Sequence, residues 1–175
     1  MRCWHNTMNT LKNIFAVAAV LIAIASASFA QTSLPSLDGG SVDVQAQKGK
    51  VVVLAVGATW LPLSAKQAQF TNAMVKNYGG KNVAFYFIAT DSTDPKDKKN
   101  HAKDEKIREW ATANKLTINV LRDSGGAVVT KNFAVDQLPA FVVLDKNGSR
   151  SEVFTGIDPN YDITVPISKK IDSLL

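Results

Sequence analysis

The stretch that decides the fold is Val51-Val-Val-Leu-Ala-Val56-Gly-Ala-Thr-Trp60-Leu-Pro-Leu-Ser64. Its first six residues are a continuous apolar run, which is typical of a buried β-strand. The run breaks at Gly57, and apolar residues then recur at helical spacing over residues 65–78. A strand, a loop and a helix in this order place the loop at the carboxyl edge of a sheet, where α/β proteins usually position their chemistry.

The rest of the chain continues the same alternation of strands and helices. The sequence predicts an N-terminal β-hairpin around Asp38-Gly-Gly40, in which the glycines adopt positive φ. Further elements are predicted at residues 82–89 (strand), 107–114 (helix), 116–123 (strand), 127–133 (helix), 139–144 (strand), 150–155 (edge strand) and 163–175 (helix). One helix between successive core strands predicts an α/β fold with a mixed central sheet and helices on both faces.

Two separated segments resemble the thioredoxin-like superfamily, in particular secreted TlpA/ResA-type thiol–disulfide proteins and redoxins related to AhpC/TSA. Their first motif is Gly-Lys, an apolar run, then Phe-Trp-Ala-Thr-Trp-Cys-Pro-x-Cys, of which this chain keeps Gly49-Lys50, the apolar run, Ala58-Thr59-Trp60 and Pro62. Their second motif, Tyr-x-Val-x-x-x-Pro, an apolar run and Asp-x-x-Gly, is similar to residues 133–148, with Pro139 at the position of the family's cis-proline. The resemblance implies a thioredoxin-like fold over nearly all of residues 34–175.

The chain departs from this family at the two positions that carry its chemistry. Leu61 and Ser64 stand where the family has its cysteines. A family active site depends on a cysteine thiolate at a helix N-terminus, which attacks a disulfide. Leucine has no nucleophile, and a serine hydroxyl has no sulfur chemistry. We therefore interpret Ser64 as an N-cap or first-turn residue that accepts a hydrogen bond from a free amide.

The N-terminal residues have the pattern of a secretory signal peptide. An apolar run over residues 14–25 follows Arg2 and Lys12 without any acidic residue, and Ser28-Phe-Ala30 supplies small residues before a cleavage site. We expect a signal peptide at residues 1–30 and a thioredoxin-like domain at residues 31–175, secreted to the bacterial periplasm and without membrane association after cleavage. The alternative is that the segment stays uncleaved as a membrane anchor.

The single cysteine of the chain, Cys3, precedes the predicted cleavage site. A chain without residues 1–30 has no thiol and keeps His101 as its one histidine. It cannot perform dithiol exchange or build a thiolate or multi-histidine metal site by itself. We therefore predict no catalytic residue, no metal and no cofactor, although the family resemblance leaves the assignment as an enzyme open.

Residues 90–106 are the most polar part of the chain. Their lysines alternate with acidic residues, and no aromatic residue accompanies them. Mixed charges of this kind are typical of a solvated loop and helix face. We therefore expect no nucleic-acid binding here.

The remaining candidate function is binding. Trp60 and Pro139 correspond to walls of the groove in which the family binds extended peptides, and a peptide could pair with backbone groups beside Pro139. The predicted binding residues are Trp60, Leu61, Pro62, Leu63, Leu138 and Pro139. We expect a redox-inactive protein- or peptide-binding module. The alternatives are a thiol–disulfide oxidoreductase or redoxin-type antioxidant whose thiols come from a partner, and a pseudoenzyme that regulates an active paralogue.

Overall fold

The structure is a computed structural model that describes residues 32–175, so the predicted signal peptide lies outside the described residues. The strands are β1 (Ser33–Pro35), β2 (Ser41–Asp43), β3 (Val51–Gly57), β4 (Val83–Ala89), β5 (Asn119–Arg122), β6 (Ala140–Leu144) and β7 (Arg150–Thr155). The helices are α2 (Ser64–Asn77), α3 (Asp104–Ala113), the short 3-10 helix η1 (Ser124–Gly126), α4 (Ala127–Phe133) and α5 (Thr164–Leu174).

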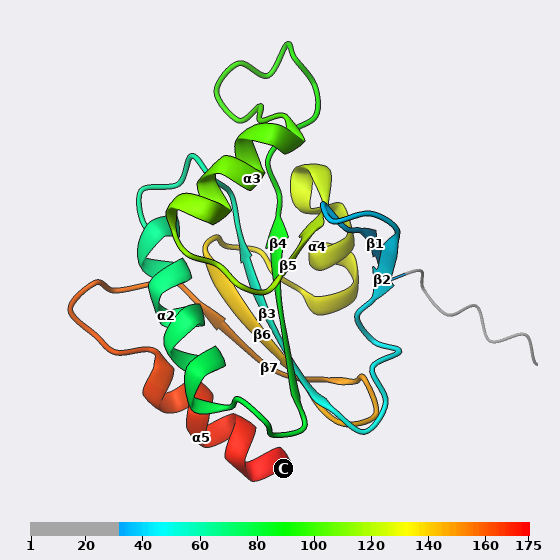
Figure 1. The fold of residues 1–175 in the computed structure, drawn as a ribbon, viewed down its shortest axis with the longest axis vertical. Helices are drawn as coiled ribbons and strands as arrows, with labels where there is room; N and C mark the ends of the chain where they lie inside the picture. The colour runs from blue at the N-terminus through cyan, green and yellow to red at the C-terminus, as the bar shows by residue number, and fades with distance from the viewer. Residues whose placement is uncertain (1–31) are drawn as a thin grey trace, which may run out of the picture. The chain divides into compact units, whose positions relative to one another are not determined.

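A mixed five-stranded sheet in the order β5-β4-β3-β6-β7 forms the centre of the domain (Figure 1). β3 pairs in parallel with β4 and antiparallel with β6. β1 and β2 form a separate antiparallel hairpin. The predicted α/β architecture, with a mixed sheet and an N-terminal hairpin, is confirmed.

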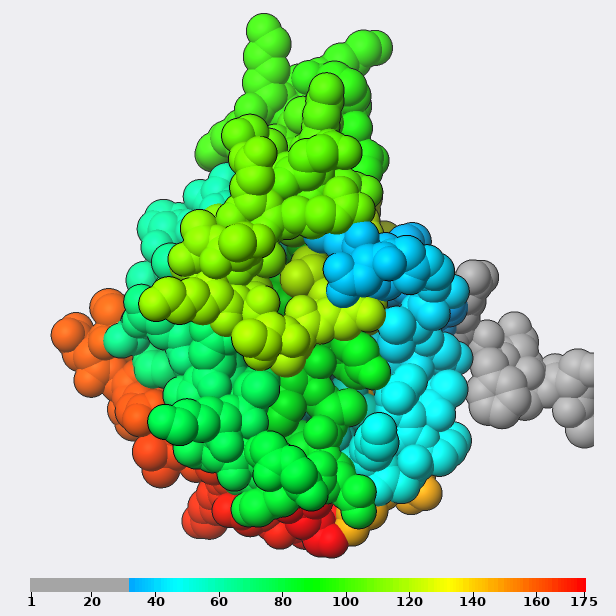
Figure 2. Space-filling model, in the orientation of Figure 1, coloured from blue at the N-terminus to red at the C-terminus, as the bar shows by residue number. Residues whose placement is uncertain are grey.

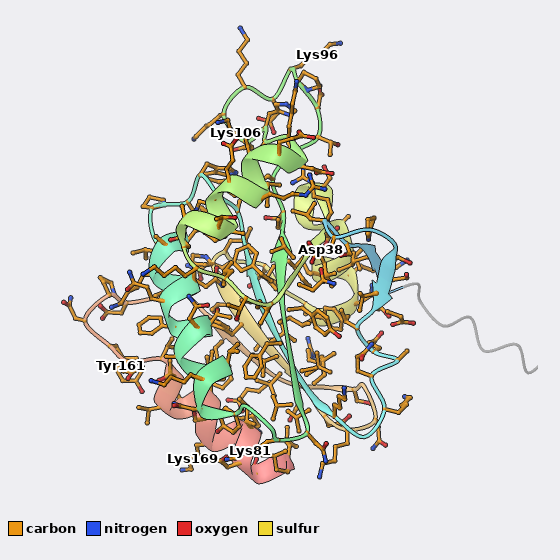
Figure 3. All side chains as sticks on the ribbon, viewed as in Figure 1. Asp38, Lys81, Lys96, Lys106, Tyr161 and Lys169 are labelled. Atoms are coloured by element: carbon orange, nitrogen blue, oxygen red, sulfur yellow. The ribbon has the colours of Figure 1, made fainter. Side chains whose placement is uncertain are left out.

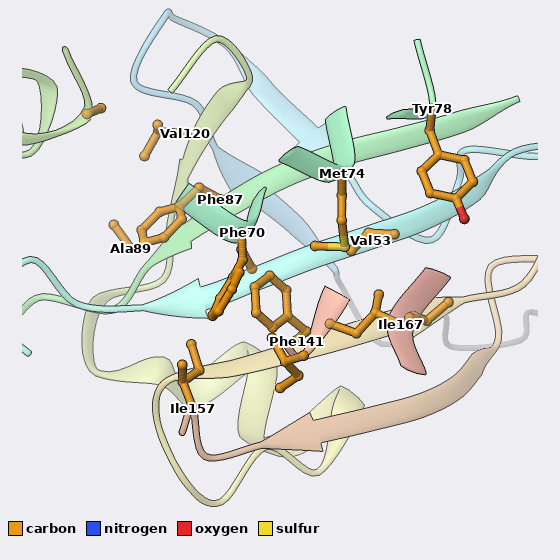
Figure 4. Close-up of a cluster of buried hydrophobic side chains, with 14 of the residues drawn as sticks. Val53, Phe70, Met74, Tyr78, Phe87, Ala89, Val120, Phe141, Ile157 and Ile167 are labelled. Carbon is orange, nitrogen blue, oxygen red and sulfur yellow. The ribbon is translucent and has the colours of Figure 1, made fainter. Parts of the chain in front are cut away.

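The fully buried strand β3 places alternate side chains in two separate cores, because successive side chains of a strand point to opposite faces. Val53 and the alternate residues of β3 that point to the same face pack with α2, α3 and α5. In this core, Phe70, Met74 and Ile167 lie around Phe141 (Figure 4). Val52, Leu54 and Val56 pack on the other face, against α4 and the hairpin. Helices therefore cover both faces of the sheet.

The element boundaries differ from the prediction by a few residues. β3 continues through Gly57, where the sequence predicted a break, and β5 begins three residues later than predicted. The 127–133 helix and the 150–155 strand have the predicted boundaries. No helix among residues 32–175 is long and apolar enough to span a membrane.

The predicted polar segment between β4 and α3, residues 90–103, extends beyond the body of the domain (Figure 2). Lys96 in this segment and Lys106 in α3 are exposed to solvent (Figure 3). Lys106 pairs with Glu109 at 2.8 Å on the same exposed helix face. These contacts agree with the interpretation of a solvated surface.

Candidate functional site

The two family-like segments meet at one edge of the sheet. Val56 pairs with Ala140 in the antiparallel β3–β6 ladder, so the register places Gly57 opposite Pro139. The β3–α2 loop, residues 58–63, therefore starts beside the residue that precedes β6. The Leu138–Pro139 peptide bond is cis. Gly57 and Pro139, which are far apart in sequence, thus lie in one site.

A buried carboxylate holds the start of the β3–α2 loop in place. Asp91 follows β4 and has no exposed surface. Its two carboxylate oxygens each lie 3.1 Å from the backbone nitrogen of Thr59, which donates to them, and the Thr59 hydroxyl donates to Asp91 as well. Because charged acceptors make the stronger hydrogen bonds of proteins, this contact fixes the backbone just before Trp60.

Ser64 does not have the capping role that the sequence predicted. It is the first residue of α2, is fully buried, and donates its hydroxyl hydrogen to the carbonyl oxygen of Ala58. No side-chain cap hydrogen bond is present at the start of α2. Its predicted place in the first turn is thus confirmed, and the predicted hydrogen bond from a free amide is wrong. The loop turns back through the Leu61–Ala58 and Ser64–Leu61 backbone hydrogen bonds, which bring a carbonyl oxygen to the hydroxyl instead.

Gln67 joins α2 to both strands beneath the loop. Its side chain is fully buried, and Nε2 donates to the carbonyl oxygens of Val56 at 3.1 Å and Ala140 at 2.8 Å. A Cβ atom on Gly57 would lie 2.5 Å from Gln67 Oε1, so only glycine fits at this position unless Gln67 moves. Oε1 has no hydrogen-bond partner among the described residues. Gln67 thus closes the β3–β6 ladder next to Pro139.

The surface above this framework is apolar. Trp60 is 43% exposed, and Pro62 is exposed beside it. Leu61 is half-buried, and Leu63 packs against the core shared by α2, α3 and α5. Of the predicted binding residues in this loop, Trp60 and Pro62 are therefore exposed, whereas Leu61 and Leu63 are half-buried.

The other wall of the site comes from residues 133–139 and from the β7–α5 loop, residues 156–163. Leu138 is half-buried against the second core, and Pro139 is buried. The N–H of Gly156 donates to the carbonyl oxygen of Pro139 at 3.2 Å. No hydrogen bond among the described residues uses the backbone groups of Leu138. The edge beside Pro139 therefore keeps backbone groups that can pair with another chain.

The β7–α5 loop contains Asp162, a carboxyl group whose pKa is lowered. The side-chain and backbone hydrogen bonds that Thr164 donates to Asp162 lower the pKa of that carboxyl below its usual value, and the positive charge of Lys66 lowers it further. Lys66 belongs to the first turn of α2. The β7–α5 loop and the start of that helix therefore interact through the opposite charges of Asp162 and Lys66.

The site contains no evident nucleophile or metal cluster. The Ser64 hydroxyl donates its hydrogen bond to the carbonyl oxygen of Ala58 in the loop. His101 lies in the β4–α3 segment, and its Nδ1 is 3.1 Å from the carbonyl oxygen of Ser92. Among residues 32–175, no group of three or more His, Cys, Asp or Glu side chains is arranged to hold a metal ion. Leu61 and Ser64, at the family's cysteine positions, supply no thiol.

Sequence reasoning missed Asp91, Gln67 and Gly156 as residues of this site. Asp91 carries a usable signal, because it directly follows a buried strand at the carboxyl edge of the sheet. Gln67 shares the buried helix face with Ala68 and Met74, and a polar residue on such a face indicates a specific partner. Gly156 has no local signal of its role.

Comparisons with known proteins agree with this geometry. Solved structures with a similar fold include a putative thiol:disulfide interchange protein DsbE from Chlorobium tepidum, with TM-score 0.67 and 20% identity over 81% of this chain and 91% of that one. A secreted Mycobacterium tuberculosis disulfide oxidoreductase has TM-score 0.62 and 21% identity, over 82% of this chain and 96% of that one. A thioredoxin-like protein from Aeropyrum pernix has TM-score 0.65 and 17% identity, over 94% and 99%.

Identities at this level establish the fold alone. A search of curated proteins gives no match. The model of the AhpC/TSA family matches residues 26–149. These residues include the whole β3–α2 loop, Asp91 and the segment around Pro139. With the fold, the register at Pro139 and this match together, the chain belongs to the AhpC/TSA family and has a thioredoxin-like fold.

Proposed function

We propose that the protein is a redox-inactive member of its family that binds an extended peptide or protein segment beside Trp60 and Pro139. The observation that carries this proposal is the contrast between a retained framework and lost chemistry. Asp91, Gln67 and the segment at Pro139 hold the loop, whereas Leu61 and Ser64 replace both thiols.

The chemistry of the surface supports peptide binding. Trp60 and Pro62 offer exposed apolar area, and the unused N–H and carbonyl of Leu138 offer a place for β-strand pairing. Aromatic side chains dominate the energetics of binding surfaces. An extended segment would therefore pair its backbone with Leu138 and pack an apolar side chain on Trp60.

The signal-like N-terminus supports a secreted, periplasmic location, in which partners would be exported proteins. The second candidate, a thiol–disulfide oxidoreductase or redoxin-type antioxidant, is favoured by the family match. It requires a partner to supply both thiols, because Cys3 is the only cysteine in the chain.

Site-specific photo-crosslinking in cells tests the binding proposal. A benzophenone amino acid replaces Trp60, and a matched control replaces Val165, which is 63% exposed in α5. We expect discrete crosslinked products from position 60 that disappear when Pro139→Thr is added, and none from position 165. Equal products from both positions, or none from position 60, would contradict the proposal.

An insulin-reduction assay with dithiothreitol separates the second candidate. The purified protein should give the rate of dithiothreitol alone. A higher rate without any added thiol protein would favour catalysis, and a higher rate only with periplasmic extract would favour thiols supplied by a partner.

A further inference from the structure

The segments around Trp60 carry a charge opposite to that of the whole chain. The chain has 20 Lys and Arg residues against 15 Asp and Glu residues, which gives a formal net charge of +5. The segments that build the site are residues 58–63, 133–139 and 156–163. They contain the aspartates Asp136, Asp158 and Asp162, and no Lys, Arg or His. A basic protein therefore has an acidic border at its candidate binding site.

Two of these three carboxylates lack a cationic partner. Asp162 interacts with Lys66 in the first turn of α2, so its charge is balanced within the protein. Asp136 and Asp158 are exposed, and neither forms an ion pair with any residue among 32–175. Asp158 accepts a hydrogen bond from the backbone N–H of Asn160 at 2.8 Å, which does not neutralise its charge. The surplus negative charge of the site therefore comes from Asp136 and Asp158.

Asp136 and Asp158 belong to chain segments that contact each other. The N–H of Gly156 donates to the carbonyl oxygen of Pro139 at 3.2 Å. A Cβ atom on Gly156 would lie 4.0 Å from Gln137 Nε2. Asp136 adjoins Gln137, and Asp158 follows Gly156 by two residues. Because like charges on neighbouring segments repel each other, a cation bound beside them would lower the energy of both carboxylates.

The capacity to bind comes from the neighbouring groups, and the aspartates select the partner. Trp60 is 43% exposed, and the backbone groups of Leu138 have no hydrogen bond among the described residues. Asp136 precedes Leu138 by two residues. A segment that pairs its backbone with Leu138 would therefore pass close to Asp136. Complementary charge across an interface favours the matching partner, and like charge excludes the wrong one.

We propose that the segment bound beside Trp60 and Pro139 is basic, an extended stretch of a partner protein in which Lys or Arg residues accompany the apolar ones. The apolar side chains pack on Trp60, and the cationic side chains reach Asp136 and Asp158 through their long aliphatic stems. This inference rests on the proposed binding function, and it adds the chemical class of the partner.

An NMR titration of the ¹⁵N-labelled protein tests the charge preference. The probes are blocked peptides of equal length in which valine alternates with lysine, with glutamine or with glutamate, and the signals are the Trp60 indole N–H and the Leu138 amide. We expect the lysine peptide to bind at least about threefold more tightly than the glutamine peptide, and the glutamate peptide to bind most weakly. Raising sodium chloride from about 50 mM to about 500 mM should remove most of this difference, because salt screens exposed charges.

The outcomes separate the two proposals. Equal affinities for the three peptides, or tighter binding of the glutamate peptide, would overturn the charge preference and leave the binding function in place. Unchanged Trp60 and Leu138 signals with every peptide would overturn both.

Charge-removing variants locate the preference. The double variant Asp136→Asn, Asp158→Asn should bring the affinity for the lysine peptide to within about twofold of that for the glutamine peptide, and leave the glutamine peptide unaffected. The control Asp38→Asn makes the same change at an exposed aspartate of the β1–β2 hairpin and should keep the full preference (Figure 3). If the double variant does not fold, Asp136→Asn alone decides. A full lysine preference in a folded variant would refute the assignment to these carboxylates.

Discussion

The β3–α2 loop and the β4–α3 segment leave the same edge of the sheet but treat their polar groups in opposite ways. In the first, Thr59 donates to Asp91 of the neighbouring segment, and Ser64 donates to the loop backbone. Beside the second, at the end of β5, a buried guanidinium nitrogen of Arg122 has no hydrogen-bond partner among the described residues. The first region is a hydrogen-bonded scaffold without a thiol at positions 61 and 64, and the second lies beside a donor that has no acceptor among the described residues.

The comparison shows that the loop is held by contacts that do not involve the two family cysteine positions. Asp91 and Gln67 contact backbone groups, so their contribution does not depend on whether position 61 or 64 carries sulfur. Each experiment below tests one side of this comparison.

Restoring the thiols should give the largest effect. The double variant Leu61→Cys, Ser64→Cys places one thiol half-exposed in the loop and one buried at the first residue of α2. The helix N-terminus lowers a cysteine pKa, so the exposed thiol should be reactive, and insulin reduction should rise at least about 100-fold above the parent protein. The single variant Ser64→Cys is the control. An inactive double variant would show that the scaffold has lost the geometry as well as the sulfur.

Removing the buried amide should give the largest change in stability. Gln67→Ala deletes two hydrogen bonds to buried carbonyl oxygens and leaves a cavity, so the free energy of unfolding should fall by about 2–3 kcal/mol. Gln69→Ala, exposed on the same helix, should change it by less than about 0.5 kcal/mol. Urea denaturation measures both. Equal effects would mean that Gln67 does not join α2 to the strands.

The buried carboxylate of Asp91 should matter less to stability than Gln67 but more than an exposed carboxylate of the same β4–α3 segment. Asp91→Ala leaves the Thr59 N–H without its charged acceptor, so unfolding should become easier by about 1–2 kcal/mol. Asp94, which is exposed and accepts from the N–H of Lys96 at 2.9 Å, provides the matched substitution, Asp94→Ala, with an expected change below about 0.5 kcal/mol. Thermal and urea unfolding compare the two variants. A larger loss in Asp94→Ala would reverse the contrast between the regions.

A smaller, pH-dependent effect concerns the β7–α5 loop that borders the site. Because Asp162 has a lowered pKa in the folded protein, its contribution to stability is present above the unfolded value near 3.8 and is lost as pH falls through the folded value. Asp162→Asn should therefore show a shallower decline of its urea midpoint between pH 5 and pH 3 than the parent protein, with little difference at pH 2. A carboxyl titration by NMR checks the direction, and a midpoint above 3.8 would contradict it.

The sequence alone determined the class of fold and the absence of cysteine at the two family positions. The apolar run of β3, the glycine turns and the two family-like segments predicted the elements and their order, because periodicity and turn residues act locally. The replacement of both cysteines, at Leu61 and Ser64, is likewise a matter of atom content that needs no coordinates. What these patterns could not predict was the use of each polar side chain.

Only the tertiary structure decided those uses, since they depend on contacts between residues distant in sequence. It placed Asp91 under Thr59, turned the Ser64 hydroxyl toward Ala58, and packed Leu63 partly against the core. It also brought Arg122 beside the start of α3, which no local pattern indicates. The sequence sets which groups exist, and long-range packing sets which of them are already bonded and which remain available to a ligand.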